Sequence, residues 1–423
     1  MRKLLFLLVL VVVGTGTAAP ATAATDVDAV RTWNGLGLTA VRTLRATDAD
    51  SARLYAMLNV AVYDAVNGLT GARTHALVPG RGPRHADPQA AAVGAAHAVL
   101  VSLDPARTAT YDARLAADLD ALGPGRRVAD GARWGRQVGE RVVAARTGDG
   151  STPVESQPAG TGPGVFRAAW SGVQYRAVRP FAVADPGRYV PGPPPALDSV
   201  LYAAAFAEVK ILGDAAVPAP DLLDTYLYWS LPAGSSQPPG EWLRIALEVA
   251  GARRLPLAEQ ARLTALLTMA LADTTVATVA TKYAYRHWRP TTAIQEADTD
   301  GNPLTQPDTA WSARAGSPGG TPEYVSGHSS YSGAGAAALA GFFCADGIAF
   351  THVTDSAPGG TPRTYPGFSA AAAEAGRSRV YGGQHFEFSN QAGLGIGRGV
   401  AGEVLASRLL HRKGPTHTGE CPR

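Results

Sequence analysis

The segment from Pro256 to about Arg286 constrains the fold most, because it has the pattern of one long, mostly apolar helix. Proline is tolerated in the first turn of a helix, so Pro256 marks its start. A helix that is apolar on all sides has to be buried, so other elements are expected to surround it. Alanine-rich segments with helical spacing dominate the rest of the chain, and strand-like alternation is almost absent. The sequence therefore predicts an all-α fold, a helical bundle with long irregular connections.

Further helices are expected on both sides of this segment. Their predicted ranges are Ala52–Val66, Thr108–Leu122, Val128–Arg146, Asp198–Leu212, Leu222–Trp229, Pro239–Ala252, Ser326–Phe343, Ser369–Tyr381 and Gln391–His411. Glycine and proline are concentrated in residues 147–197, which we interpret as an irregular connection. The predicted organisation is an N-terminal helical half with this linker (residues 25–197), a C-terminal helical bundle (198–411) and a tail (412–423).

The first residues have the pattern of an export signal. Arg2 and Lys3 precede the apolar run from Leu4 to Val13, and Ala21-Thr22-Ala23 supplies small residues for cleavage near residue 23 or 24. The run of ten apolar residues is too short to span a bilayer, which needs about 20. We therefore expect residues 1–24 to be a signal peptide and the protein to be secreted and extracellular.

Charge and cysteine content limit the partners. Residues 1–24 hold two basic and no acidic residues, so the remaining chain carries 36 basic against 35 acidic residues. This balance gives no field for nucleic acid or for a membrane surface. The two cysteines, Cys344 and Cys421, suit an oxidising compartment and are expected to form a disulfide that ties the tail to a helix; one buried and one frayed thiol is the alternative.

Three clusters of polar residues carry the chemistry, and the first is at the end of the long helix. Seven residues separate Lys282 from Arg289, about two turns at 3.6 residues per turn, so both cations are expected to point the same way. Pro290 is expected to stop the helix after Arg289. Two cations near a helix C-terminus can also simply complement its dipole.

The second and third clusters add different groups. Ser326-Gly327-His328 stands where a loop enters an alanine-rich helix, whose first N–H groups can bind an anion. His328 is placed to exchange a proton, although a plain serine N-cap with an incidental histidine is the alternative. Arg379 offers a fork of donors that suits oxyanions, and Gly382-Gly383 can turn His385 back toward it. Taken together, these residues predict a pocket for one tetrahedral or trigonal-bipyramidal oxyanion.

These blocks resemble the signature of the type 2 phosphatidic acid phosphatase and vanadium haloperoxidase superfamily. The matching residues are Lys282 with Arg289-Pro290, then Ser326-Gly327-His328, then Ser378-Arg379 with His385. Segments outside the pocket are similar to the soluble bacterial haloperoxidase branch, among them Tyr63-Asp64-Ala65-Val66-Asn67, Arg179-Pro180-Phe181, Thr299-Asp300-Gly301-Asn302-Pro303 and Tyr381-Gly382-Gly383. The resemblance covers most of residues 30–411 and implies the helical-bundle fold of that family.

The resemblance also implies roles for the pocket residues. The non-bridging oxygens of vanadate would be held by Lys282, Arg289, Ser326, Gly327 and Arg379. His385 would be the metal ligand in a peroxidase or the phosphorylated nucleophile in a phosphatase. His328 would be the acid–base residue on the opposite side, and Lys282 would hydrogen-bond the bound hydrogen peroxide.

Two positions depart from the family pattern. Val325 replaces the proline that precedes Ser-Gly-His, which is expected to cost some loop rigidity. Ser389 stands where many members have the aspartate that orients the histidine. We expect Ser389, Glu387 or Asn390 to hydrogen-bond His385 instead, less strongly than an aspartate would.

The function predicted is a secreted vanadium-dependent haloperoxidase, with vanadate as cofactor and with hydrogen peroxide, halide and a small organic molecule as substrates. The alternatives are a secreted acid phosphatase with a phosphohistidine at His385 and a non-catalytic oxyanion-binding protein. A homodimer is allowed by a bundle of this size, although no heptad marks an interface. The sequence does not fix the halide or the organic substrate.

Overall fold

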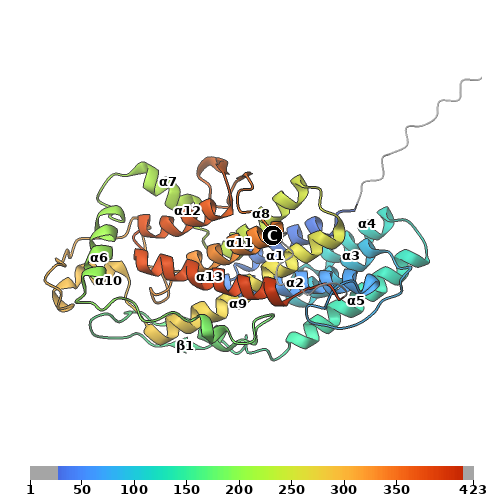
Figure 1. The fold of residues 1–423 in the computed structure, drawn as a ribbon, viewed down its shortest axis with the longest axis horizontal. Coiled ribbons are helices and arrows are strands. Elements are labelled where there is room, and N and C mark those ends of the chain that lie inside the picture. The colour runs from blue at the N-terminus through green and yellow to red at the C-terminus, as the bar shows by residue number, and fades with distance from the viewer. Residues whose placement is uncertain (1–26, 413–423) are drawn as a thin grey trace, which may run out of the picture.

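The computed structural model describes residues 27–412. These residues form an elongated assembly of helices (Figure 1). The predicted signal peptide, most of the predicted tail and Cys421 lie outside the described residues. The helices are α1 (Ala29–Leu44), α2 (Asp48–Thr70), α3 (Pro88–Leu103), α4 (Thr108–Ala121), α5 (Arg126–Arg146), α6 (Val200–Leu212), α7 (Pro220–Tyr228), α8 (Gln237–Ala252), α9 (Leu257–Tyr285), α10 (Pro290–Gln295), α11 (Gly327–Phe343), α12 (Phe368–Tyr381) and α13 (Glu387–Ser407).

Two small antiparallel sheets complete the fold. β1 (Ser156–Gln157) pairs with β2 (Trp170–Ser171), and β3 (Phe350–His352) pairs with β4 (Arg363–Tyr365). The all-α prediction is confirmed. The helices α1, α3 and α10 were not predicted, and α13 begins at Glu387, four residues before the predicted Gln391.

The long helix α9 lies at the centre, as predicted. It is long and apolar enough to cross a membrane, but 94% of its most apolar window is buried inside the protein, as expected for a core helix. Helix α2 from the N-terminal half and helices α11 and α13 from the C-terminal half pack against it. The main core therefore draws on both halves of the chain.

Buried carboxylates fix two irregular segments to the helices. Asp64 of α2 accepts hydrogen bonds from the backbone N–H groups of residues 76, 77 and 78 at 2.7–2.9 Å. Asp273, in the middle of α9, accepts from those of Phe181, Ala182 and Val183, each at 2.7 Å. Each carboxylate thus satisfies three backbone donors. Asp64 holds residues 76–78 against α2, and Asp273 holds the linker predicted at residues 147–197 against the central helix.

Glycines let α11 and α13 approach closely. A Cβ on Gly333 would lie 2.3 Å from the carbonyl oxygen of Leu394, and one on Gly397 would lie 2.1 Å from that of Ser330. Larger side chains would push the helices apart. The close approach places the start of α11 beside the start of α13, where the N–H of Ser326 donates to the carbonyl of Ser389 at 3.3 Å.

Candidate oxyanion site

The seven predicted pocket residues come from α9, α10, α11, α12 and the turn before α13. Arg289 and His385 are in direct contact, with 2.9 Å between the guanidinium Nη1 and the imidazole Nε2. Burial lowers the pKa of His385 most, and the positive charges of the nearby Lys282 and Arg379 lower it further. His328 lies within the same electrostatic range of His385. The structure therefore brings residues from three distant stretches of the chain together around His385.

Arg289 reaches the site by a different route from the one predicted. The helix α9 ends at Tyr285 because Arg286 adopts a left-handed conformation with φ 47°. Arg289 is the N-cap of α10, which begins at Pro290, so the expectation that Pro290 ends the long helix was wrong. Lys282 and Arg289 both reach the site, as predicted. The predicted reason, that they lie two turns apart on one helix, was wrong, because Lys282 belongs to α9 and Arg289 caps α10.

Backbone carbonyls hold the cations in place. Lys282 donates from Nζ to the carbonyl of Pro322. Arg289 donates from Nε to the carbonyl of Thr321 at 2.8 Å and from Nη1 to that of Gln384 at 2.7 Å. All three acceptors are neutral, so they orient the cations without cancelling their charge.

Arg379 keeps part of its hydrogen-bonding capacity free. It donates to the side-chain oxygen of Gln384 and to the carbonyl of Trp229, and its guanidinium lies 5.1 Å from the centre of the Tyr226 ring. Its Nε is buried and has no hydrogen-bond partner among the described residues. A buried donor without a partner is costly, which favours a ligand acceptor at this position.

The turn at the start of α11 supplies a hydroxyl and backbone donors. Ser326 is the N-cap, and its hydroxyl oxygen accepts from the N–H of Ser329 at 3.3 Å. Gly327 and His328 are the first helical residues, so their N–H groups are among those that helix geometry leaves unpaired. The helix dipole adds a partial positive charge at this end.

His328 is fixed in one tautomer by its neighbour. Its Nε2 lies 3.1 Å from the carbonyl oxygen of Ser230, which can only accept, so Nε2 carries the proton. Burial and then the charge of Arg379 lower its pKa well below the ordinary value of histidine. His328 is therefore a neutral imidazole whose Nδ1 can take up a proton.

Glu323 orients His385, and sequence reasoning missed it. Its Oε1 lies 2.9 Å from Nδ1 of His385 and accepts the backbone N–H of Phe386 at 3.0 Å. The residue is fully buried, and burial raises its pKa while Arg289 opposes the rise. Because a carboxylate accepts from Nδ1–H, the Nε2 lone pair of His385 faces the cations.

Of the three alternatives for orienting His385, Ser389 lies within hydrogen-bond distance of its ring, and the other two have different partners. Glu387 bonds Arg377 and Asn390, so this prediction was wrong for both Glu387 and Asn390. Ser389 lies at a marginal 3.5 Å from Nδ1 and donates to the carbonyl of Glu323 at 3.2 Å. The only available signal for Glu323 was an acidic residue three positions before Ser326.

Two neighbouring residues of the first cluster have structural contacts. Trp288 is fully buried and donates from Nε1 to the hydroxyl of Tyr202 at 3.1 Å, which agrees with its predicted packing role. His287 lies among Tyr202, Phe386 and Phe388, and burial lowers its pKa to about 3. The side-chain hydrogen bonds of these two residues go to Gly164 and Tyr202 and not to the cations of the site.

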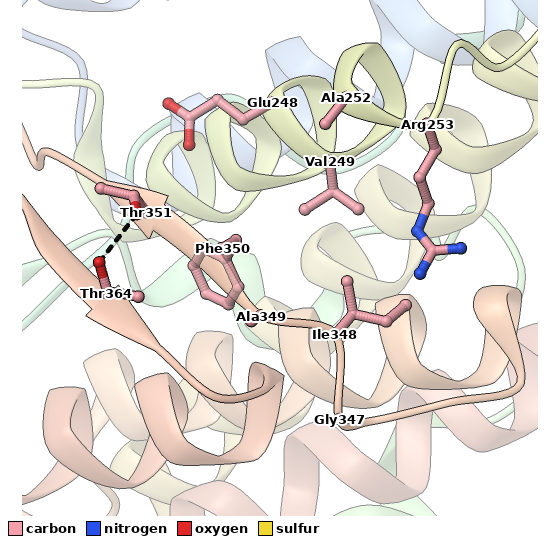
Figure 2. Close-up of a pocket in the computed structure, with 10 residues that line it drawn as sticks. All are labelled: Glu248, Val249, Ala252, Arg253, Gly347, Ile348, Ala349, Phe350, Thr351 and Thr364. Atoms are coloured by element: carbon pink, nitrogen blue, oxygen red, sulfur yellow. Dashed lines mark hydrogen bonds between the residues drawn. The ribbon is translucent and has the colours of Figure 1, made fainter.

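A separate cavity lies between α8 and the β3–β4 hairpin and has a volume of about 570 Å³ (Figure 2). Val249, Ile348 and Phe350 form its apolar wall, and Glu248 of α8 and Arg253, the C-cap of that helix, stand beside it. None of the seven pocket residues lines this cavity. It does not belong to the oxyanion site. Among the described residues no group of three or more His, Cys, Asp or Glu side chains could hold a metal ion on its own.

The disulfide prediction is tested at one of its two ends. Cys344, the C-cap of α11, is disulfide-bonded. Its predicted partner, Cys421, lies outside the described residues.

Comparisons with known proteins agree with the predicted resemblance. Residues 262–413 match the family model of the VCPO second helical-bundle domain. The chain is similar to the solved structure of the first bacterial vanadium-dependent iodoperoxidase, with a TM-score of 0.77 and 22% identity over 92% of this chain and 98% of that one. It is also similar to apo-type and holo-type bacterial vanadium-dependent chloroperoxidase, with TM-scores of 0.64, identities of 16% and 17%, and coverage of 84% and 85% of this chain and 92% of each relative. No curated protein matches the sequence significantly.

Proposed function

We propose that this chain, which has the fold of the bacterial vanadium haloperoxidases, is a vanadium-dependent haloperoxidase that oxidises halide with hydrogen peroxide. The observation that carries the proposal is the contact between Nε2 of His385 and the guanidinium of Arg289, with Nδ1 of the same ring held by Glu323. This arrangement offers an imidazole lone pair inside a cationic pocket, which a metal oxyanion requires.

The charge of the pocket fits vanadate. Lys282, Arg289 and Arg379 are each no more than 6% exposed. Burial and the nearby charge of Arg379 together lower the pKa of Arg289 to about 10, although Glu323 opposes the fall. Burial and the charge of Arg289 likewise lower the pKa of Lys282. A bound oxyanion would relieve this mutual repulsion, and Nε of Arg379 would gain the acceptor that it lacks among the described residues.

Each pocket residue then has a role. Lys282, Arg289, Arg379, the Ser326 hydroxyl and the backbone at Gly327 would hold the oxygens, and His385 would hold the metal through Nε2. Vanadate, when bound, supplies a Lewis-acidic centre at which hydrogen peroxide is activated for attack by halide.

Proton transfer falls to His328. Its neutral ring keeps Nδ1 as the acceptor, so it can remove a proton from hydrogen peroxide as the peroxide binds. The ring can return that proton when water leaves. Lys282 would donate a hydrogen bond to hydrogen peroxide in the pocket.

A secreted acid phosphatase is the second candidate, and Glu323 is the observation that favours it. The sequence lacks the orienting aspartate at position 389, but the Glu323 carboxylate supports the imidazole ring from another segment. Such a carboxylate also stabilises the imidazolium that forms when a histidine attacks phosphate. Phosphate and vanadate share charge and shape, so the pocket residues do not separate these activities.

One experiment distinguishes the candidates. The purified chain without residues 1–24 is loaded with orthovanadate, and bromination of a phenolic dye is followed with hydrogen peroxide and bromide. Iodide and chloride are tested in parallel. A phosphatase assay with a chromogenic phosphomonoester runs on the vanadate-free protein.

A His385→Ala variant is expected to abolish bromination. The matched control is His97→Ala, because His97 contacts Asp112 between α3 and α4, away from the site. Phosphate release without halide oxidation by any halide would overturn the peroxidase proposal in favour of the phosphatase. The absence of both activities would leave an oxyanion-binding protein.

Export completes the proposal. The basic start and short apolar run of residues 1–13 support a cleaved signal peptide. N-terminal sequencing of the protein recovered from the medium of an expressing bacterial culture is expected to start near residue 24 or 25. Retention of Met1 on the secreted chain, or confinement to the cells, would contradict export.

A further inference from the structure

One carboxylate from the N-terminal half lies against the oxyanion turn. Asp48 is the first residue of α2, and its Oδ2 lies 3.6 Å from the point where a Cβ on Gly327 would stand. Its Oδ1 accepts the N–H of Ala49 at 2.8 Å, which fixes the carboxylate at the helix start. The residue is only partly buried. Asp48 therefore lies beside Gly327, whose backbone the proposed function assigns to the oxyanion.

The surroundings of Asp48 give its carboxylate no close ion-pair partner among the described residues, since no Lys, Arg or His nitrogen there forms an ion pair with it within 4.0 Å. Lys282 of α9, Tyr331 of α11 and Asp50 of its own helix are the titratable groups that face it. Burial raises its pKa, and the charge of Lys282 opposes the rise.

A carboxylate at this position is at first sight unfavourable, because it repels the anion that the cations attract. The repulsion becomes a hydrogen bond if the anion carries a proton on the oxygen that faces Asp48. An ionised carboxylate can only accept, so it can bind P–OH or V–OH but not a bare oxygen. The three cations of the pocket attract any oxyanion of the same shape and charge and provide no such selection.

We propose that Asp48 makes the pocket selective for protonated oxyanions, such as hydrogen phosphate and hydrogen vanadate, over sulfate, which carries no proton at neutral pH. The inference rests on the proposed function, because it assigns the specificity of the same site. A site built to hydrogen-bond a ligand hydroxyl rejects an analogue that lacks it, because the polar group of the site is then left without a partner and here faces a like charge.

The selectivity has a defined pH dependence. Above the pKa of Asp48 the carboxylate accepts from phosphate and repels sulfate. Below that pKa the carboxylic acid becomes a donor and can bind a bare oxygen. The preference for phosphate is therefore expected to shrink as the pH falls.

The test measures anion binding rather than oxidation. Isothermal titration calorimetry of the vanadate-free protein with sodium phosphate and with sodium sulfate gives two dissociation constants at each pH. At neutral pH the wild type is expected to bind sulfate at least about tenfold more weakly than phosphate. The wild-type pH series needs no variant and tests the predicted decline by itself.

Asp48→Asn is expected to bring the two constants within about threefold of each other, mainly by strengthening sulfate binding. The matched control is Asp50→Asn, because Asp50 lies two residues away and accepts from the hydroxyl of Tyr175 instead. It is expected to keep the wild-type preference.

An unchanged preference in Asp48→Asn, or a preference in the wild type that does not vary with pH, would overturn the role of Asp48. That result would leave the proposed function intact, because halide oxidation is assayed separately. Failure of the wild type to bind either anion would overturn the role of Asp48 together with the oxyanion pocket itself.

Discussion

Replacing Glu323 by glutamine tests how the pocket distinguishes vanadate from phosphate. Oε1 of Glu323 accepts from Nδ1 of His385 and from the N–H of Phe386, while Oε2 is buried without a hydrogen-bond partner among the described residues. A glutamine can keep its carbonyl oxygen in the first position and place its NH2 group in the second. Burial raises the pKa of Glu323 to about 7, so above that pH the substitution removes a charge with little change in shape.

Two opposite effects follow. A carboxylate and an anion separated by an imidazole ring, roughly 7 Å, repel by about 2 kcal/mol at an effective dielectric constant of about 20. Removing that repulsion favours phosphate and vanadate alike, by roughly 30-fold. Loss of the carboxylate also makes Nε2 of His385 less basic, and changes of this kind cost about 10–100-fold in metal affinity. Only vanadate needs the Nε2 bond, so only vanadate suffers the second effect.

The ratio of the two affinities is the quantity to measure. Calorimetric titration of vanadate-free Glu323→Gln with phosphate and with orthovanadate at one pH is expected to show that vanadate loses its advantage by about 10–100-fold. Glu387→Gln is the control, because Glu387 bonds Arg377 and Asn390 rather than His385. A ratio equal to that of the wild type would refute both the ligand role of His385 and the supporting role of Glu323.

Three further substitutions test the site and the fold. Arg289→Lys is expected to weaken phosphate binding by about 10–100-fold in calorimetry, because an ammonium cannot reproduce the contacts to Thr321, Gln384 and His385. Asp273→Asn is expected to lower the free energy of unfolding in urea by about 2–4 kcal/mol, since an amide accepts three backbone N–H groups poorly. His287→Phe is expected to reduce sensitivity to acid. The pKa of His287 is about 3 in the folded protein, against an ordinary value of 6.5. Between these two pH values the folded wild type therefore binds fewer protons at His287 than the unfolded chain does. Stability is therefore lost as the pH falls, and urea unfolding should favour the variant over the wild type by about 1.4 kcal/mol per pH unit within that window; a difference that does not vary with pH would contradict this.

The helical fold could be predicted because its signals are local. The apolar run from Pro256 to Arg286 gave the central helix within one residue at each end. The Gly-Pro-Gly break after residue 122 separated α4 from α5. The left-handed residue that ends α9 was not predictable in the same way, because Arg286 is neither glycine nor asparagine. The position of Arg289 on α10 follows from that turn.

The group of pocket residues was predicted, but two of its carboxylates were not. Glu323 and Asp48 act on His385 and Gly327, which are 62 and 279 positions away in the chain. No spacing rule connects residues at such separations. The missing aspartate at position 389 suggested a weaker support for His385, whereas the fold supplies a carboxylate from the loop before α11.

The partners of the cations explain why this pocket suits an anion. Lys282 bonds the carbonyl of Pro322, Arg289 those of Thr321 and Gln384, and Arg379 that of Trp229. A carboxylate would hold each cation as firmly but would neutralise it, as Asp149 does for the buried Arg146. Carbonyl oxygens fix the direction of a cation and leave its full charge available. The carboxylate of Glu323 makes its hydrogen bonds to His385 and Phe386 instead. Its negative charge therefore supports the imidazole, and the positive charges of the three cations remain available to the ligand.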